Sequence, residues 1–237
     1  MPGYTRHQLK QDKFAEAAAE TLHWTVVHRK TIVTASGIAG VVLAAVLGGW
    51  LYLRHQDGKA SEELGAAVRT LTAPLGAPDP NAPGIQTFPT AKERAQAAQK
   101  KFREIAEKYR FTKTAEIAHY LAGVTAGELG DVATAEQELA KVAGSRNKDL
   151  APLAKLAMAA MYHGQGRDAD AIKIYKELID HPTPAVPKTL VQLELAALYE
   201  ESQPAEAVRL YQQIKIEDPN GPAGQIASSR LELVMQP

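Results

Sequence analysis

Residues 123–142, GVTAGELGDVATAEQELAKV, and residues 159–178, AAMYHGQGRDADAIKIYKEL, are two copies of one pattern, and this self-similarity decides the fold. The copies are offset by 36 positions at both ends, from 123 to 159 and from 142 to 178. Gly130 and Gly166 occupy the same place in each copy. A constant period of roughly 20 to 50 residues is typical of solenoids, in which each copy is one supersecondary unit that packs on the next.

Two degenerate copies flank this pair. The later copy contains Ala196, Tyr199, Ala207, Tyr211, Ile214 and Pro219, and the earlier one contains Ala98, Phe102 and Ile105. Within each copy, a small residue and an alanine allow two antiparallel helices to approach closely. The aromatic residue or leucine four positions after that alanine then fills the space toward the next pair. The sequence therefore predicts an all-α chain of packed helix pairs.

The positions of glycine and proline in the copies agree with the prediction of packed helix pairs. Gly130 and Gly166 are predicted at the turn inside each pair, because only glycine readily adopts a positive φ. Between copies, helices are stopped by Pro182, Pro184, Pro187 and Pro219. The whole pattern resembles the tetratricopeptide repeat, whose period is about 34 residues. The tryptophan of that repeat is absent, and a generic helical bundle with fortuitous spacing is the alternative.

Residues 31–53, TIVTASGIAGVVLAAVLGGWLYL, contain no Asp, Glu, Lys, Arg or His. As a helix they would extend about 34 Å, slightly more than the roughly 30 Å hydrocarbon core of a bilayer. A cleaved signal peptide is the alternative. The leader before the stretch is too long for one, however, and no small-x-small cleavage site follows. The predicted fold class is therefore all-α, with one N-terminal transmembrane helix followed by a tetratricopeptide-repeat α-solenoid.

The flanking charges predict the orientation of this helix. Five Lys or Arg residues precede it and three follow closely, which favours an N-terminus in the cytoplasm. Residues 1–30 then form a cytoplasmic leader, in which residues 9–27 have one apolar stripe. That stripe predicts an amphipathic helix on the inner leaflet, or alternatively a helix that binds a partner. Residues 54–237 form the repeat domain.

The repeat domain is predicted to contain two special segments. Residues 61–71 have helical periodicity, with Ser61 as the expected N-cap, and helix resumes at residues 91–109. Between them, residues 72–90 are a proline-rich insertion, interpreted as a flexible loop with a docking peptide as the alternative. Residues 222–235 are predicted to form a capping helix that covers the last repeat.

Small residues recur every four positions inside the predicted transmembrane helix, at Ser36, Gly40, Ala44 and Gly48. Such a stripe allows another helix to pack closely against it. The sequence therefore predicts packing with a partner helix or with a second copy, and so a possible homo-oligomer through this helix.

Composition and motifs indicate a binding protein and not an enzyme. The 27 basic and 27 acidic residues balance, which argues against nucleic-acid binding, and the absence of cysteine excludes thiolate catalysis and disulfides. Glu116 and His119 form half of a di-iron carboxylate motif, but the second half is absent. We therefore interpret His119, His163 and His181 as surface residues. We expect no catalytic residue, metal ligand or cofactor.

The binding surface is expected on the inner face of the first helix of each pair. The repeat pattern places there the apolar residues Ile117, Tyr120, Val124, Leu153, Leu156, Leu190 and Leu193. This row lacks the basic clamp that holds a C-terminal carboxylate in related domains, so it suits apolar segments of a protein partner. Coverage of the row by the protein's own N- or C-terminal helix is the alternative.

The complete layout is similar to that of the bacterial ancillary subunit of the SecYEG translocon, in a domain family that also includes a periplasmic cell-division coordinator. The resemblance implies a single-pass inner-membrane protein with its repeat domain in the periplasm. Its implied partners are the Sec translocon, emerging secretory polypeptides and periplasmic chaperones. A scaffold for envelope assembly or cell division, which binds a folded partner, is the alternative function.

Overall fold

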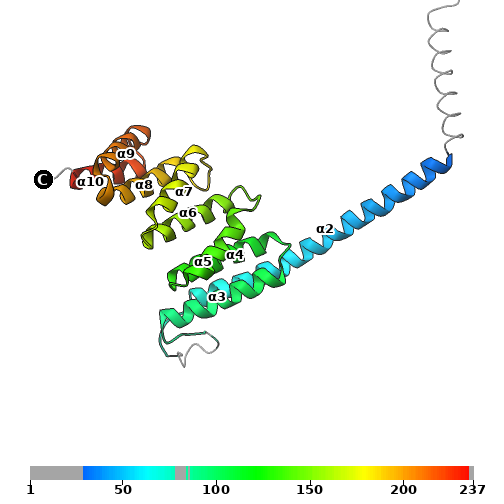
Figure 1. Cartoon of the computed structure of the whole chain (residues 1–237). Helices are drawn as coiled ribbons and strands as arrows, with labels where there is room; N and C mark the ends of the chain where they lie inside the picture. The colour runs from blue at the N-terminus through cyan, green and yellow to red at the C-terminus, as the bar shows by residue number, and fades with distance from the viewer. Residues whose placement is uncertain (1–28, 78–83, 85, 235–237) are drawn as a thin grey trace, which may run out of the picture. The chain divides into compact units, whose positions relative to one another are not determined.

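The computed structural model describes residues 29–77, 84 and 86–234, and in that part the regular structure is helical apart from one isolated β-bridge (Figure 1). The predicted leader helix at residues 9–27 lies outside the described residues. The chain divides into two units, Met1–His55 and Gln56–Pro237. The all-α prediction is confirmed.

Helix α2 (Arg29–Leu71) is one helix whose residues belong to both units. Its first part carries the apolar stretch, in which large side chains such as Val41 and Leu51 are exposed, so this is not the core helix of a globular domain. The guanidinium of Arg54 lies 5.4 Å from the ring centroid of Trp50. By length and composition the stretch is able to cross a membrane, and a signal sequence near an N-terminus has the same properties.

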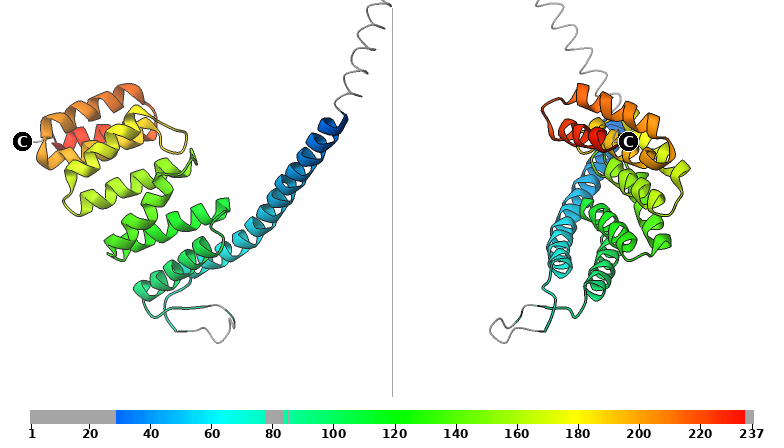
Figure 2. Two further views of the ribbon diagram at one scale, coloured as in Figure 1. Left: turned by 45° about the vertical axis from the view of Figure 1, so that its right-hand side comes forward. Right: turned by 90° about the vertical axis from the view of Figure 1, so that its left-hand side faces the viewer.

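The second unit is a series of antiparallel helix pairs, in which each helix packs on its neighbours along the chain (Figure 2). The end of α2 is the first helix of the first pair, and α10 follows the last pair. The helices after α2 are α3 (Ala91–Lys108), α4 (Lys113–Glu128), α5 (Val132–Ala143), α6 (Leu150–Gly164), α7 (Asp168–Asp180), α8 (Lys188–Ser202), α9 (Pro204–Glu217) and α10 (Pro222–Val234).

The repeat positions predicted to pack are the buried core. Ala135 and Ala171 are completely buried, and the aromatic residues Phe102, Tyr175 and Tyr211 are among the largest fully buried side chains. Burial raises the pKa of Tyr175 to about 12. Small residues therefore bring the helices together, and large side chains fill the seams between pairs.

The turns also follow the prediction. Gly130 and Gly166 adopt φ values of +77° and +71° between the helices of their pairs. Three prolines lie between α7 and α8, and Pro219 lies between α9 and α10. Prolines, which cannot continue a helix, therefore follow the α6–α7 and α8–α9 pairs, and glycines with positive φ separate the helices of the α4–α5 and α6–α7 pairs.

The expected N-cap at Ser61 is wrong. Helix α2 continues through Ser61, and its hydroxyl lies 3.0 Å from the hydroxyl of Thr114 at the start of α4. Asp57 accepts a hydrogen bond of 3.0 Å from the backbone N–H of Thr114, and Glu63 accepts one of 2.8 Å from the Tyr109 hydroxyl. The end of α2 thus serves as the first helix of the first pair.

Residues 72–90 connect α2 to α3. The two ends of this connection are joined by an isolated bridge between Leu75 and Phe88, with hydrogen bonds from Gly76 N–H to the Phe88 carbonyl (2.9 Å) and from Phe88 N–H to the Pro74 carbonyl (3.1 Å). Phe88 is buried. The connection is therefore closed at its base.

Helix α10 packs on α9 and α8 at the C-terminal end of the series. It buries Gly224, Ala227 and Leu231, which lie on one face at helical spacing. The carboxylate of Asp218 accepts the Ala223 N–H at 3.1 Å and so caps the start of the helix. Terminal repeats of a solenoid need such a cover because their outer face has no further neighbour.

Helices α4 and α5 approach each other closely at Gly123. A Cβ atom at this position would lie 2.7 Å from Leu139 Cγ and 3.1 Å from the Leu139 backbone nitrogen. One turn later, a Cβ at Gly127 would lie 3.9 Å from the Ala135 Cβ, an ordinary contact. We expect Gly123→Ala to lower the free energy of unfolding, since overpacking of about 1–3 kcal/mol exceeds the helix-propensity gain of about 1 kcal/mol.

Urea unfolding followed by circular dichroism would measure this difference, with Gly127→Ala as the matched control. The control should be neutral or slightly stabilising. Equal stability of the two variants would show that α4 and α5 do not approach as described.

Candidate protein-binding site

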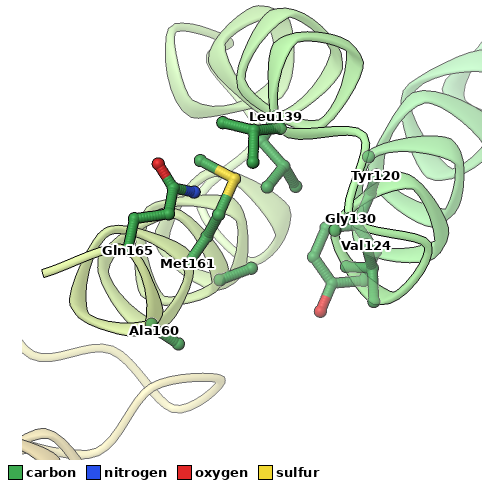
Figure 3. A pocket seen from close by; sticks show the side chains of 12 residues that line it. Tyr120, Val124, Gly130, Leu139, Ala160, Met161 and Gln165 are labelled. Carbon is green, nitrogen blue, oxygen red and sulfur yellow. The ribbon is translucent and has the colours of Figure 1, made fainter.

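A hollow of about 560 Å³ lies between α4, α5 and α6 (Figure 3). Tyr120 and Val124 of α4 face Met161 and Gln165 across it, and Leu139 of α5 lies between the two walls. The full lining consists of Tyr120, Gly123, Val124, Gly127, Gly130, Val132, Leu139, Ala157, Ala160, Met161, Gly164 and Gln165. Its volume is in the range of typical ligand sites, roughly 300–1,000 Å³.

The hollow exists because small residues face it from both walls. On α6, Ala157, Ala160 and Gly164 lie on one helix face and leave the space between the helices unfilled. Gly127 does the same on α4. Ala160 and Gln165 are exposed, so the hollow opens to solvent.

The walls combine apolar surface with two polar groups. Val124, Leu139 and Met161 supply the apolar part, and a methionine side chain adapts readily to partners of different shape. Among the described residues, the Tyr120 hydroxyl and the Gln165 amide have no hydrogen-bond partner. Burial raises the pKa of Tyr120. The arrangement suits apolar side chains together with the backbone of a bound polypeptide.

The lining of the hollow includes only part of the predicted row of seven residues. Tyr120 and Val124 line the hollow, whereas Ile117 and Leu190 are exposed outside it (39% and 37%). The remaining three, Leu153, Leu156 and Leu193, are partly buried against the hydrophobic core.

The sequence analysis missed the wall that α6 contributes. Ala157, Ala160, Met161 and Gly164 follow the spacing of one helix face, and this signal could have identified them. No residue of α10 lines the hollow, so within the described chain the C-terminal helix does not cover it.

A buried carboxylate joins three helices next to this site. Glu138 of α5 is 2% exposed, and its carboxylate lies 2.5 Å from His119 Nδ1 of α4 and 3.2 Å from Lys141 Nζ. Arg103 of α3 approaches it at 3.7 Å. Because an ionised carboxylate only accepts hydrogen bonds, His119 Nδ1 must donate. The interpretation of His119 as a surface histidine is therefore wrong.

Burial acts to raise the pKa of Glu138, but the hydrogen bonds from His119 and Lys141 and the positive charge of Lys141 outweigh it and hold the pKa below its ordinary value. A carboxylate whose pKa is lower in the folded state stabilises the protein above its unfolded pKa. That stabilisation is lost as the pH falls through the folded value.

We therefore expect Glu138→Gln to cost about 1–3 kcal/mol at pH 7, because it removes charge-assisted hydrogen bonds from a buried site. The stability of the variant should also depend less on pH below about 5 than that of the wild type. Urea unfolding at a series of pH values measures both effects. Glu104→Gln, an exposed change on α3, is the control and should follow the wild-type pH profile.

The other candidate chemical groups serve structural contacts. Glu116 accepts a hydrogen bond from the Asn147 side chain at 2.9 Å, and His163 contacts Asp168 at 2.8 Å on the surface. In the described part of the chain, no group of three or more His, Asp or Glu side chains is arranged to hold a metal ion.

Comparison with known proteins identifies the fold at the family level. A family model described as a tetratricopeptide repeat-like domain matches residues 23–185. The chain belongs to this family. No curated protein and no solved structure matches the chain.

Tetratricopeptide repeat-like domains are typically scaffolds for protein–protein interaction and not catalysts. The matched residues include both walls of the hollow. Family membership therefore indicates protein partners in general for this tetratricopeptide repeat-like protein, and the hollow is a candidate for a contact site.

Proposed function

We propose that this protein is a single-pass inner-membrane adaptor that binds polypeptide segments in the hollow between α4 and α6. It would act beside the Sec translocon and pass emerging secretory polypeptides to periplasmic chaperones. The observation that carries the proposal is the open hollow, whose apolar walls are combined with polar groups on Tyr120 and Gln165 that have no hydrogen-bond partner among the described residues. The resemblance in layout to the translocon subunit supplies the proposed location.

Three features of the sequence support the membrane part of this proposal. The apolar stretch at residues 31–53 has the length of a span, and the excess of basic residues before it favours a cytoplasmic N-terminus. The stripe Ser36, Gly40, Ala44 and Gly48 would allow this helix to pair with a partner helix or with a second copy. The repeat domain would then lie in the periplasm.

Weak contacts are sufficient for this role. A hollow of about 560 Å³ accommodates only a few side chains, so each bound segment would be held loosely. Anchoring beside an exit pore raises the effective concentration of emerging chains, and this compensates for low intrinsic affinity. A methionine and several glycines in the lining favour tolerance of many sequences.

The test is site-specific photo-crosslinking in intact cells, with the full-length protein. Tyr120 is replaced by an aromatic photo-crosslinking amino acid, which preserves the shape of the side chain. Adducts with many secretory proteins, together with translocon subunits or periplasmic chaperones, would support the proposal. One dominant folded envelope protein would instead indicate the scaffold function, and adducts within the protein alone would refute an open binding hollow.

A blocking variant adds a matched control. Ala160→Phe places a large side chain at the mouth of the hollow and should remove most adducts formed from position 120. Ala169→Phe makes the same change at an exposed position of α7 that does not line the hollow, and it should leave the adducts intact. Equal adduct yields in both variants would exclude the hollow as the site.

A further inference from the structure

The connection between α3 and α4 exposes a large aromatic side chain. Phe111 is 71% exposed, and no other aromatic side chain among the described residues after Leu53 is exposed. The Arg110 guanidinium lies 4.7 Å from the ring centroid of Phe111, and the exposed Lys113 follows two residues later. Exposed apolar surface can mark an interaction site, so the location of Phe111 in the domain indicates what it could contact.

Both ends of this connection are fixed to the beginning of the repeat domain. Tyr109 is buried, and its hydroxyl donates to Glu63 of α2. Thr112 is buried and caps α4 by accepting the Ala115 N–H at 3.1 Å. The backbone N–H of Thr114 donates to Asp57 at 3.0 Å. Phe111 is therefore exposed on a connection that is fixed on both sides and contacts α2 at Asp57 and Glu63.

Chain length places this frame close to the end of the apolar stretch. Asp57 follows Leu53 by four positions, so the two residues can be separated by at most about 14 Å, whatever the angle between the two units. If the chain is helical there, the separation along the axis is about 6 Å. The headgroup layer on each side of the hydrocarbon core is roughly 5–8 Å thick. A span that ends at Leu53 therefore brings the Phe111 connection within reach of lipid headgroups.

We propose that Phe111 inserts into the interfacial layer of the leaflet at the C-terminal end of the span, with Arg110 and Lys113 at the level of the phosphates. This inference rests on the proposed membrane anchoring of α2. Aromatic rings are favoured at the membrane interface, and long basic side chains extend toward phosphate groups. The acidic groups nearby, Asp57 and Glu116, are engaged in hydrogen bonds to Thr114 and Asn147.

The next connection, between α5 and α6, adds positive charge beside the first. The Asn147 side chain donates to Glu116 in the first turn of α4, which fixes this connection next to the start of α4. Arg146 and Lys148 on either side of Asn147 are exposed, and neither has an ion pair among the described residues. Arg146 and Lys148 thus add positive charge beside Arg110 and Lys113, offset in part by the exposed Asp149, and this favours a leaflet that contains anionic lipids.

The test uses the absence of native cysteine, since Phe111→Cys gives a single labelling site in the full-length protein. The cysteine is labelled with a polarity-sensitive fluorophore. The protein is then reconstituted into liposomes of phosphatidylethanolamine and phosphatidylglycerol that contain no other protein. Ile216→Cys on α9 is the control, because Ile216 is comparably exposed (79%) and lies at the opposite end of the repeat domain. Circular dichroism checks that both variants fold.

The expected result is emission shifted to shorter wavelength at position 111, with quenching by lipids that carry a headgroup spin label, and neither effect at position 216. Replacing Arg110 and Lys113 by glutamine should reduce the shift in liposomes rich in phosphatidylglycerol. Water-like emission at position 111 in protein that resists carbonate extraction would overturn this inference and leave the span intact. Equal shifts at both positions would also overturn it, because the fluorophore alone would then explain them. Extraction of the protein by carbonate would instead refute the proposed membrane anchor.

Discussion

Gly224→Ala is expected to detach α10 from the end of the repeat domain. A Cβ atom at this position would overlap the backbone carbonyl of Asp218, which cannot move aside as a flexible side chain could. The same turn caps α10 through the Asp218 carboxylate, so relieving the overlap also opens the cap. We expect a loss of about 3 kcal/mol or more in the free energy of unfolding, at the upper end of overpacking effects.

Limited proteolysis and urea unfolding of the full-length protein in detergent would measure this loss. Detachment should create a new cleavage site near Gly221 and expose Leu231, which α10 normally buries. Gly164→Ala is the control, because a Cβ there would meet nothing within 4 Å. An intact C-terminal helix in the Gly224→Ala variant would contradict the docking of α10 described above.

Phe102→Ala should be comparably severe, at about 3–5 kcal/mol. Phe102 is completely buried in the cluster formed by the end of α2, α3 and α4, together with Ala60, Ala67 and Ala118. Its removal leaves a cavity where the first helix pair meets the second, and the surrounding backbone can collapse only partly. The first pair should therefore unfold at lower urea concentration than the rest of the domain.

The matched control is Phe111→Ala, which makes the same change at an exposed site and should alter stability by less than about 0.5 kcal/mol in detergent. Hydrogen exchange of α2, α3 and α4 would localise the effect of Phe102→Ala. If the two variants were equally stable, the end of α2 would not form the first helix of the repeat domain.

The helix pairs were predictable because their determinants are local and periodic. A buried alanine such as Ala171 allows two helices to approach closely. The aromatic side chain of Tyr175, four residues later, fills the space toward the next pair. Gly166 marks the turn with its positive φ. The buried alanine and the large residue four positions later recur in the other copies, as in Ala98 with Phe102 and Ala207 with Tyr211, so even degenerate copies are recognisable.

Prediction from the local sequence failed where a side chain interacts with a residue that is distant along the chain. Ser61 has the chemistry of an N-cap, but α2 continues through it and its hydroxyl contacts Thr114, 53 positions away. Glu138 and His119 are 19 positions apart on different helices, and no spacing rule predicts their pairing. The shape of the hollow likewise depends on which side chains are missing, and a search for large apolar residues overlooks alanines and glycines such as Ala160 and Gly164.

The hollow lies across the seam between two repeats, since α4 belongs to one pair and α6 to the next. In a solenoid each repeat contacts only its neighbours, so the seam is the joint about which adjacent repeats can bend. A polypeptide bound between Tyr120 and Met161 would contact both repeats and restrict their bending at that seam. Binding of the polypeptide would therefore slow local opening, and with it amide hydrogen exchange, in the middle of the domain. Amide exchange in α8 to α10 would continue at the rate of the unliganded protein.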